Sequence, residues 1–460
     1  MAGWAGADEP PGPLRSAFPK DFLWGAAVAA YQNEGDNFGS DLWNWERRQG
    51  WESSGKAANS WEMEDTDLAL LKDLGVNAHR LSLEWGRIMP DPDRPDEAVL
   101  KHYEALLIRL RKAGIRPAVT LHHFTNPAWF WRRHPEGWKD PSAAEDFLAF
   151  AGLLAERFGK YVDHWMTFNE PMVYNFNGHV VGYFPPGERR PLSPLTGTLM
   201  PAVRTMTDAH RRAWKLIHAK DRWDADGDGT PARVGLVMNI SLVQPLEDSP
   251  RHRAAAERWD HFFHWNMLDA AAGKGLDFDL DGKPEEMTEQ TASTLDFIGI
   301  NYYTRVFVRS LPLVLPPLEA FPFHAEVLTD PTGRLLWKLA GGRLGPGPKE
   351  DMGREIFPEG IALVSKEAWR RYGKPIMITE NGLPDAKDAL KTAYIRDHLA
   401  ALQKAVQDGV PVLGYFHWTL VDNYEWGTWS QKTGLYRLDR ENGWRRTPTA
   451  ASSAYRDFLK

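Results

Sequence analysis

The sequence predicts a single (β/α)8 barrel with long loops at the carboxyl ends of its strands. Eight short apolar runs are mostly separated by helix-like stretches, and the runs are nearly continuous rather than alternating. Strands of that kind are buried on both faces, as in a parallel sheet covered by helices. A chain of 460 residues, 43% of them hydrophobic, is long enough for eight such units. A doubly wound open sheet is the alternative, but no Gly-rich phosphate loop follows the first run.

The strand candidates recur along the whole chain, each bounded by Gly, Pro or polar residues. The first is followed by a Tyr-Gln-Asn-Glu-Gly segment that contains Gln32, and the fourth ends in an Asn-Glu-Pro sequence. Chemistry in a (β/α)8 barrel sits where strands end, so polar residues at those ends are the first candidates for a site. The predicted strands span residues 22–29, 78–85, 116–123, 161–169, 233–239, 296–303, 375–379 and 412–419.

Helices are predicted from apolar residues at helical spacing and from stop signals. Leu68, Leu71 and Leu74 share one face of a helix that stops at Gly75. A Ser-Ala-Ala-Glu sequence at residues 142–145 is typical of a capping box and opens a second helix. We predict further helices over residues 100–113, 254–271 and 393–408, and the capped helix continues to residue 158.

Three segments show neither the helical nor the strand spacing of apolar residues. Residues 1–17 are expected to form a flexible tail before a barrel domain at 18–460, and residues 36–61 are expected to form a polar, Trp-rich loop. The Pro- and Gly-rich insertion at 311–353 is too long for an ordinary connection. It is therefore interpreted as a lid or a wall of a pocket.

Composition excludes several classes of function. A net charge of −7 does not favour a nucleic-acid partner, and the lack of cysteine excludes disulfides, Cys-zinc sites and thiol chemistry. No run is long enough to span a membrane or to form the core of a signal peptide, so we expect no membrane insertion and a cytoplasmic location. No cofactor is expected, and the sequence leaves the oligomeric state open. The 21 Trp and 13 Tyr residues could be core packing or stacking platforms for a sugar.

Two distant motifs suggest a paired-carboxylate site. Glu170 and Glu380 each end an apolar run, and each lies beside an Asn. Two carboxyl groups across a barrel mouth can cleave an acetal, because one protonates the leaving oxygen while the other attacks the anomeric carbon or activates a water. The separation of the two groups decides between retention and inversion, and the sequence alone leaves it open.

At these residues the chain resembles glycoside hydrolase family 1, the β-glucosidase family. The resemblance runs from about residue 22 to residue 436, and it rests on the sequences Thr-Phe-Asn-Glu-Pro and Ile-Thr-Glu-Asn-Gly in the family's order. It implies a retaining mechanism in which Glu170 is the general acid/base and Glu380 the nucleophile. Arg80 and Tyr303 match the family residues that contact the nucleophile, and a nearby guanidinium would favour its ionised form.

The same resemblance implies a sugar-binding set. Asn169 matches the family residue that holds the sugar 2-hydroxyl. Glu425 matches the family residue that accepts hydrogen bonds from the sugar 4- and 6-hydroxyls. Trp418 matches the family Trp that forms the floor of the sugar pocket, on which the sugar ring stacks. The implied substrate-binding residues are Gln32, His123, Asn169, Trp418, Glu425 and Trp426.

The implied substrate is a small, unphosphorylated β-glycoside or oligosaccharide, with glucose as glycone and galactose or fucose tolerated. An acid at Glu170 favours O-glycosides, and the segment after Glu425 lacks the Ser, Lys and Tyr of the phospho-glycosidase branch. Arg354 stands where many relatives carry a Trp, so the leaving-group side departs from the pattern. Two alternatives stay open: a transglycosylase acting on a sugar or lipid acceptor, and a sugar-binding protein without catalysis.

One further motif resembles the start of a calcium loop. Asp224, Asp226 and Asp228 alternate as in such a loop, but Gly235 stands where its last ligand, a Glu, would be needed. The motif is interpreted as a solvated turn, and no metal is expected.

Overall fold

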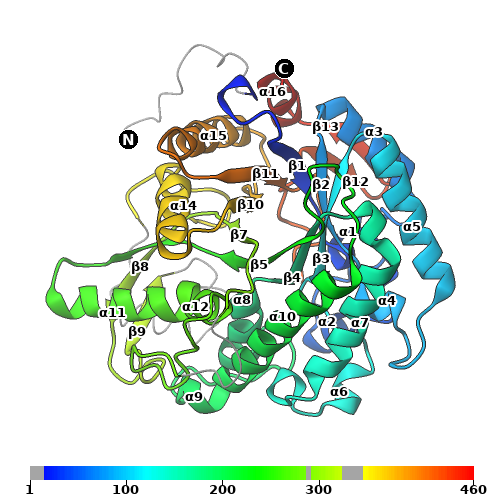
Figure 1. Cartoon of the computed structure of the whole chain (residues 1–460). Helices are drawn as coiled ribbons and strands as arrows, with labels where there is room; N and C mark the ends of the chain where they lie inside the picture. Colours follow the sequence, from blue (N-terminus) through cyan, green and yellow to red (C-terminus); the bar gives the residue numbers. More distant parts are fainter. Residues whose placement is uncertain (1–14, 286–291, 324–344) are drawn as a thin grey trace.

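The computed structural model describes residues 15–285, 292–323 and 345–460. Eight parallel strands form a closed barrel in the order β1-β11-β10-β7-β5-β4-β3-β2, so the first and last strands pair and leave no open edge. The strands occupy the centre of the molecule and helices surround them (Figure 1). The barrel strands are β1 (Leu23–Ala27), β2 (Ala78–Ser82), β3 (Arg116–His122), β4 (His164–Asn169), β5 (Arg233–Asn239), β7 (Phe297–Asn301), β10 (Ile376–Asn381) and β11 (Val412–Trp418).

A helix or a helical segment follows every barrel strand, as the predicted (β/α)8 barrel requires. In chain order these are α3 (Glu64–Leu74), α5 (Glu97–Lys112), α7 (Ala143–Phe158), α10 (Met200–Lys220), α11 and α12 (Pro250–Asp260 and Asn266–Ala271), α14 (Glu359–Tyr372), α15 (Lys391–Gln407) and α16 (Ala450–Phe458). None of the described helices combines the length and the apolar composition that crossing a bilayer requires.

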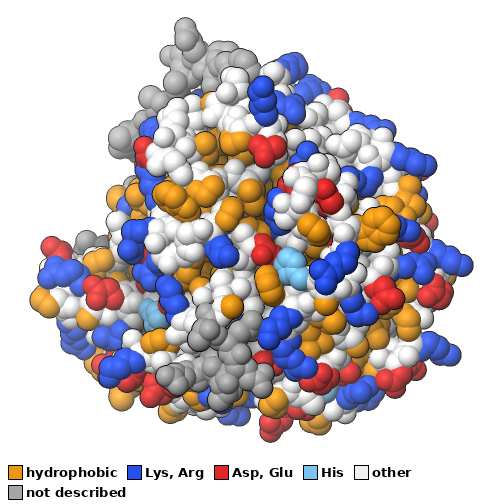
Figure 2. Space-filling view, in the orientation of Figure 1, with side chains coloured by type: hydrophobic (Ala, Val, Ile, Leu, Met, Phe, Trp, Pro, Cys, Tyr) orange, Lys and Arg blue, Asp and Glu red, His pale blue; other side chains and the backbone are white. Residues whose placement is uncertain are grey.

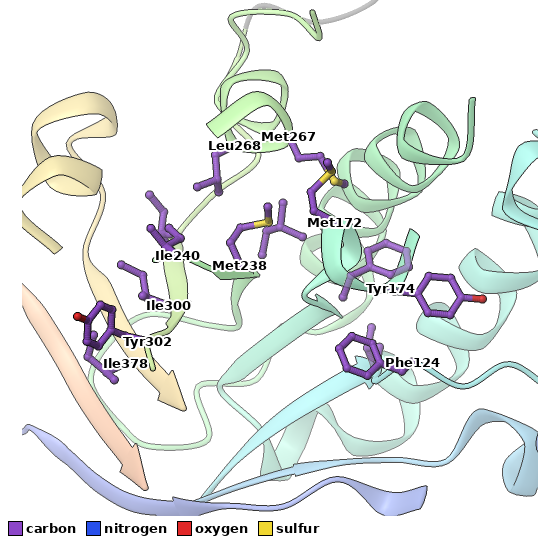
Figure 3. Packing of buried hydrophobic residues seen from close by; sticks show 14 of the residues in the cluster. Phe124, Met172, Tyr174, Met238, Ile240, Met267, Leu268, Ile300, Tyr302 and Ile378 are labelled. Carbon is purple, nitrogen blue, oxygen red and sulfur yellow. The ribbon is translucent and has the colours of Figure 1, made fainter. Parts of the chain in front are cut away.

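The strands are buried along almost their whole length because they face two cores. Inside the barrel, side chains such as Met166, Phe297 and Phe416 pack together along the axis. Outside it, Met238 of β5 points toward Met172 of α8 (Pro171–Phe176) and toward α12, where strand meets helix (Figure 3). Residues on both faces of each strand are therefore withdrawn from water, which explains why the sequence shows runs instead of alternation.

Several helices differ from their predicted form. Residues 36–61 contain α2 (Asp41–Gln49), whose N-cap Ser40 accepts a hydrogen bond from Leu42 N. The predicted capping box at α7 is wrong, because the Ser142 hydroxyl donates to Asp140 Oδ1 and its side chain caps no helical NH. The predicted helix at 254–271 starts earlier, at Pro250, and is interrupted by a π-helix at His261–Trp265.

A second sheet lies beside α11 (Figure 1). Its strands are β6 (Leu242–Pro245), β8 (Arg305–Ser310) and β9 (Ala320–Phe323), in the order β6-β8-β9. Strand β9 belongs to the insertion predicted at 311–353, of which residues 324–344 lie outside the described residues. Residues 1–14 of the expected tail also lie outside them, and Arg15–Ala17 form a short 3-10 helix. On the face drawn in Figure 2, acidic and basic side chains are interspersed among apolar ones.

Candidate active site

The two carboxyl groups singled out by the sequence lie at the carboxyl ends of two barrel strands. Glu170 follows β4 directly, with a left-handed backbone (φ 45°, ψ 54°) that turns the chain into α8 at Pro171. Glu380 is the penultimate residue of β10. Gly382 follows, and a Cβ there would lie 1.9 Å from the carbonyl oxygen of Trp418, so the Asn-Gly sequence after Glu380 lets β10 and β11 approach.

Glu380 is held by one cation and one phenol. Arg80 of β2, which is fully buried, forms an ion pair with Glu380 Oε1 through Nη1. The hydroxyl of Tyr303 donates to Glu380 Oε2 at 2.5 Å. Both oxygens therefore accept from a donor, which is the environment that a carboxylate anion needs when it is buried.

Among the described residues, Glu170 accepts hydrogen bonds from neutral groups alone. Asn301 Nδ2 donates to its Oε1 at 2.6 Å, and Asn239 Nδ2 donates to the same oxygen at 3.1 Å. Burial, reinforced by the nearby charge of Glu380, raises the pKa of Glu170 to about 8. At neutral pH this carboxyl group is therefore mostly protonated, and because both amides contact Oε1, Oε2 is left to carry the proton.

A chain of hydrogen bonds joins the two carboxyl groups. Arg80 also donates to Asn169 Oδ1 at 2.7 Å, and the same oxygen accepts from Asn301 Nδ2 at 3.0 Å. Thr379 Oγ1 donates to Asn301 Oδ1 at 2.7 Å, which fixes the orientation of that amide. Strands β2, β4, β7 and β10 thus contribute to one buried network.

Glu425 lies in a second polar group on the β1–β11 side. Trp418 Nε1 donates to Glu425 Oε1 at 2.9 Å, and Gln32 Nε2 donates to Oε2 at 3.1 Å. Burial raises the pKa of Glu425 to about 7, so the group titrates near neutrality. Each carboxyl oxygen can still accept from a further donor, such as a hydroxyl group of a ligand.

His123 connects this group to the central network. Because the Asn169 oxygen accepts from Arg80, its Nδ2 donates to His123 Nε2, at 3.2 Å. Burial, with the charge of Arg80, holds the pKa of His123 well below its usual value, so the ring is neutral and its Nδ1 carries the proton. The ring lies nearly parallel to those of Trp418 and Trp426.

Two polar atoms on the Glu425 side, His123 Nδ1 and Gln32 Oε1, are buried and have no hydrogen-bond partner among the described residues, which is also true of Arg80 Nε in the central network. His123 Nδ1 is a donor and Gln32 Oε1 is an acceptor, and buried polar groups are seldom left unpaired. They are therefore suited to pair with a polyhydroxylated ligand. The residues that the sequence implied for catalysis and sugar binding thus lie in one of two adjoining polar groups or, for Trp426, against the His123 ring that links them.

Sequence reasoning missed Asn239 and Asn301, the two amides on Glu170. Asn239 ends β5 and Asn301 ends β7, and the two are paired in register. Polar residues at the carboxyl ends of two adjacent strands were the available signal, because such ends converge in a barrel.

The calcium-like motif precedes β5 and lies beside Asp163, at the amino end of β4, whereas the two polar groups lie at the carboxyl ends of the strands. Carboxylate oxygens of Asp163, Asp224 and Asp226 come within 4.8 Å of one another, as do those of Asp277, Asp279 and Glu285. Asp224 accepts from the main-chain NH groups of Gly227, Asp228 and Gly229, which is how a turn of this kind is stabilised without a metal.

The arrangement suits the cleavage of a glycosidic bond. A mostly protonated carboxyl group and an ion-paired carboxylate end two strands of a (β/α)8 barrel, beside aromatic rings and unpaired polar atoms. One group can deliver a proton while the other attacks, which is the chemistry of an O-glycoside hydrolase.

Comparison with known proteins agrees with this class. The model of the family described as Glycosyl hydrolase family 1 matches residues 14–460. A β-galactosidase from Pyrococcus woesei is 32% identical, over 92% of this chain and 93% of its own length. β-Glucosidase 13 from Arabidopsis thaliana is 30% identical, over 97% of this chain and 92% of its own length.

Solved structures agree as well. A β-glycosidase from Pyrococcus horikoshii superposes with a TM-score of 0.80 at 32% identity, covering 97% of this chain and 95% of its own. The family 1 β-glucosidase from Thermotoga maritima superposes with a TM-score of 0.81 at 27% identity, covering 96% of this chain and 98% of its own. The chain belongs to glycosyl hydrolase family 1. It is an O-glycoside hydrolase, and a retaining mechanism is general to its family.

Proposed function

We propose that the protein is a β-glucosidase that also accepts β-galactosides and β-fucosides and releases terminal, unphosphorylated glycosyl residues. The observation that carries this proposal is the contrast between the two carboxyl groups. Glu380 is ion-paired with Arg80, whereas burial raises the pKa of Glu170 to about 8 among neutral amides. Relatives named as β-glucosidases and as a β-galactosidase support the choice of glycone.

The first half of the reaction forms a glycosyl-enzyme. Oε2 of Glu170 gives its proton to the glycosidic oxygen, and a carboxylate oxygen of Glu380 attacks the anomeric carbon as the bond to the leaving group breaks. Arg80 and Tyr303 hold the attacking group in place through the two contacts on its oxygens. The leaving group departs as a neutral alcohol.

The second half returns the enzyme to its starting state. Glu170, now ionised, takes a proton from a water, and the water oxygen attacks the anomeric carbon and displaces Glu380. Two inversions give a product of unchanged configuration. Asn169 would hold the sugar 2-hydroxyl, since its amide already lies between Arg80 and His123.

The remaining sugar contacts follow from the second polar group. Gln32, His123 and Glu425 supply donors and acceptors for hydroxyl groups, and Trp418 and Trp426 supply apolar faces for the C–H side of the ring. A carboxyl group at position 425 supports an unphosphorylated glycone, because an ionised Glu425 would repel a phosphate on the sugar.

Hydrolysis of a panel of aryl β-D-glycosides tests this proposal. We expect the wild type to cleave the glucoside, galactoside and fucoside, and Glu380→Gly to lose all three activities. Trapping with a 2-deoxy-2-fluoroglucoside should add one fluoroglucosyl group to Glu380, detectable by mass spectrometry. A wild type that cleaves none of the panel would overturn the choice of glycone, and a label on another residue would overturn the nucleophile.

Transglycosylation is a second candidate, because the family resemblance puts Arg354 where many relatives carry a Trp on the leaving-group side. The ratio of transferred to hydrolysed glucose, measured with a sugar acceptor or a lipid acceptor, decides between the two. A product mixture of free glucose alone would reject it.

A further inference from the structure

Arg354 is held rigidly at the edge of the site by a short turn. Its main-chain NH and its Nε both donate to Glu350 Oε1, at 2.8 and 3.1 Å, while Met352 N donates to Glu350 Oε2 at 3.0 Å. Gly353 supplies the left-handed conformation of the turn, with a φ of 87°. The Arg354 side chain is only 13% exposed, so it has less conformational freedom than the side chain of a surface arginine.

The guanidinium lies over the ring of Tyr303. Its carbon Cζ lies 5.0 Å from the centre of the Tyr303 ring, whose hydroxyl binds Glu380. Its charge also reaches Glu425, where it opposes the rise in pKa that burial causes. Arg354 therefore places positive charge between the residue that supports the nucleophile and the second polar group.

The topology indicates which part of the substrate meets this charge. Gln32, His123 and Trp418 approach the site from β1, β3 and β11. Glu170, which protonates the leaving group, is bound from the other side by Asn239 of β5 and Asn301 of β7. The leaving group must lie next to Glu170, and the turn that bears Arg354 belongs to the chain between β10 and β7, the strand whose Asn301 binds Glu170.

The glycone is the poorer candidate for carrying a negative charge. Glu425 already brings a carboxyl group to the sugar pocket, and a second carboxylate beside it would be repelled. A carboxylate on the leaving group avoids that repulsion and is attracted by the charge of the Arg354 guanidinium.

We propose that Arg354 makes this enzyme selective for β-glucosides whose leaving group carries a carboxylate. This inference rests on the proposed function, since it assumes that Glu170 and Glu380 cleave β-glucosides. Because Glu350 neutralises part of the charge, the selectivity is moderate, and we expect a preference of about threefold to tenfold.

Matched aryl glucosides test the proposal. The ratio of kcat/KM for 3- or 4-carboxyphenyl β-D-glucoside to that for the corresponding carbamoylphenyl glucoside compares a charged with a neutral group of the same shape. We expect this ratio to fall by about threefold to tenfold in Arg354→Gln, and to fall less in Arg354→Lys, which keeps the charge but loses the planar fork. It should also fall in the wild type at high salt.

Other outcomes distinguish a failure of the Arg354 proposal from a failure of the proposed β-glucosidase function. An unchanged ratio in Arg354→Gln, with wild-type melting temperature and intact activity on the carbamoyl compounds, overturns the proposal and leaves the β-glucosidase function standing. Cleavage of 4-nitrophenyl β-D-glucuronide by the wild type but not by Arg354→Gln would place the recognised charge on the glycone and also overturn it. No cleavage of any neutral glucoside overturns the proposed function and this inference together.

Discussion

Replacing Asn239 with Ala should move the pH dependence of the reaction in a defined direction. Asn239 donates to Glu170 Oε1 at 3.1 Å and favours its ionised form, which lowers a pKa that burial and Glu380 have raised to about 8. Without that donor the pKa of Glu170 rises further. The acid then stays protonated to higher pH, and the basic limb of kcat/KM moves toward alkaline pH.

The size of the shift follows from the contacts that remain. A hydrogen bond to a charged group contributes about 1.5–3 kcal/mol, and the Asn239 bond is the longer of the two on this oxygen. We therefore assign it half of those values, about 0.8–1.5 kcal/mol, which corresponds to about 0.6–1.1 pH units. Glu170 is only 6% exposed, so solvent screening reduces this little.

The assay is kcat/KM for phenyl β-D-glucoside, measured as glucose released between about pH 5 and pH 10. Phenolate is a poor leaving group, so the rate of its departure depends on protonation by the enzyme. Asn77→Ala is a matched control at the opposite end of the barrel, because Asn77 is also half-buried and its amide makes two hydrogen bonds. Its Oδ1 accepts from Trp24 N and its Nδ2 donates to the Phe22 carbonyl oxygen. A basic limb that stays in place in Asn239→Ala, or that moves in Asn77→Ala as well, would refute the assignment of Glu170 as the titrating acid.

Three further changes test other parts of the structure. Glu170→Gln should lower kcat/KM for phenyl glucoside by about 100- to 10,000-fold but affect 2,4-dinitrophenyl glucoside far less; equal losses on both substrates would contradict its role as proton donor. Burial raises the pKa of Glu84 from 4.5 to about 8, so between about pH 5 and pH 8 the folded wild type holds a proton that the unfolded chain has lost. The wild type therefore loses up to about 1.4 kcal/mol of stability per pH unit over this range. Glu84→Gln has no such proton, so its stability relative to the wild type should increase as the pH rises. Urea unfolding at several pH values measures this, and a constant difference would argue against it. Gly25→Ala should destabilise by about 1–3 kcal/mol, because its Cβ would lie 2.3 Å from Phe416 and 2.9 Å from the Ala78 carbonyl oxygen, whereas Gly197→Ala has nothing within 4 Å; equal melting temperatures for the two variants would contradict the packing.

The sequence was most informative where burial is two-sided. All eight barrel strands could be predicted because runs such as that ending at Phe168 are apolar on both faces. Glu170 and Glu380 could be predicted because a carboxyl group that ends such a run must face the mouth of the barrel. Helix α10 was missed, as were α14 and α16, so the barrel was predicted from its strands more than from its helices.

Other features could not be predicted because they depend on the assembled molecule. At residue 142 a Ser followed by a Glu three positions later matches a helix cap, yet Asp140 takes the hydroxyl instead. The π-helix at His261–Trp265 has no local signature in the sequence. Asn239 and Asn301 gain their place at Glu170 only when β5 and β7 are adjacent in the closed barrel.

Barrel closure also dictates when this enzyme becomes active during its synthesis. Arg80 forms its ion pair with a residue 300 positions later, and β1 finds its second neighbour only when β11 has been made. Until then a nascent chain has an unpaired strand edge and a guanidinium without its counter-ion. Contacts of such long sequence separation form late, so the catalytic centre is completed after almost the whole chain has left the ribosome. A chain truncated before β11 would therefore be inactive and prone to aggregate, even though Glu170 and Glu380 were both present.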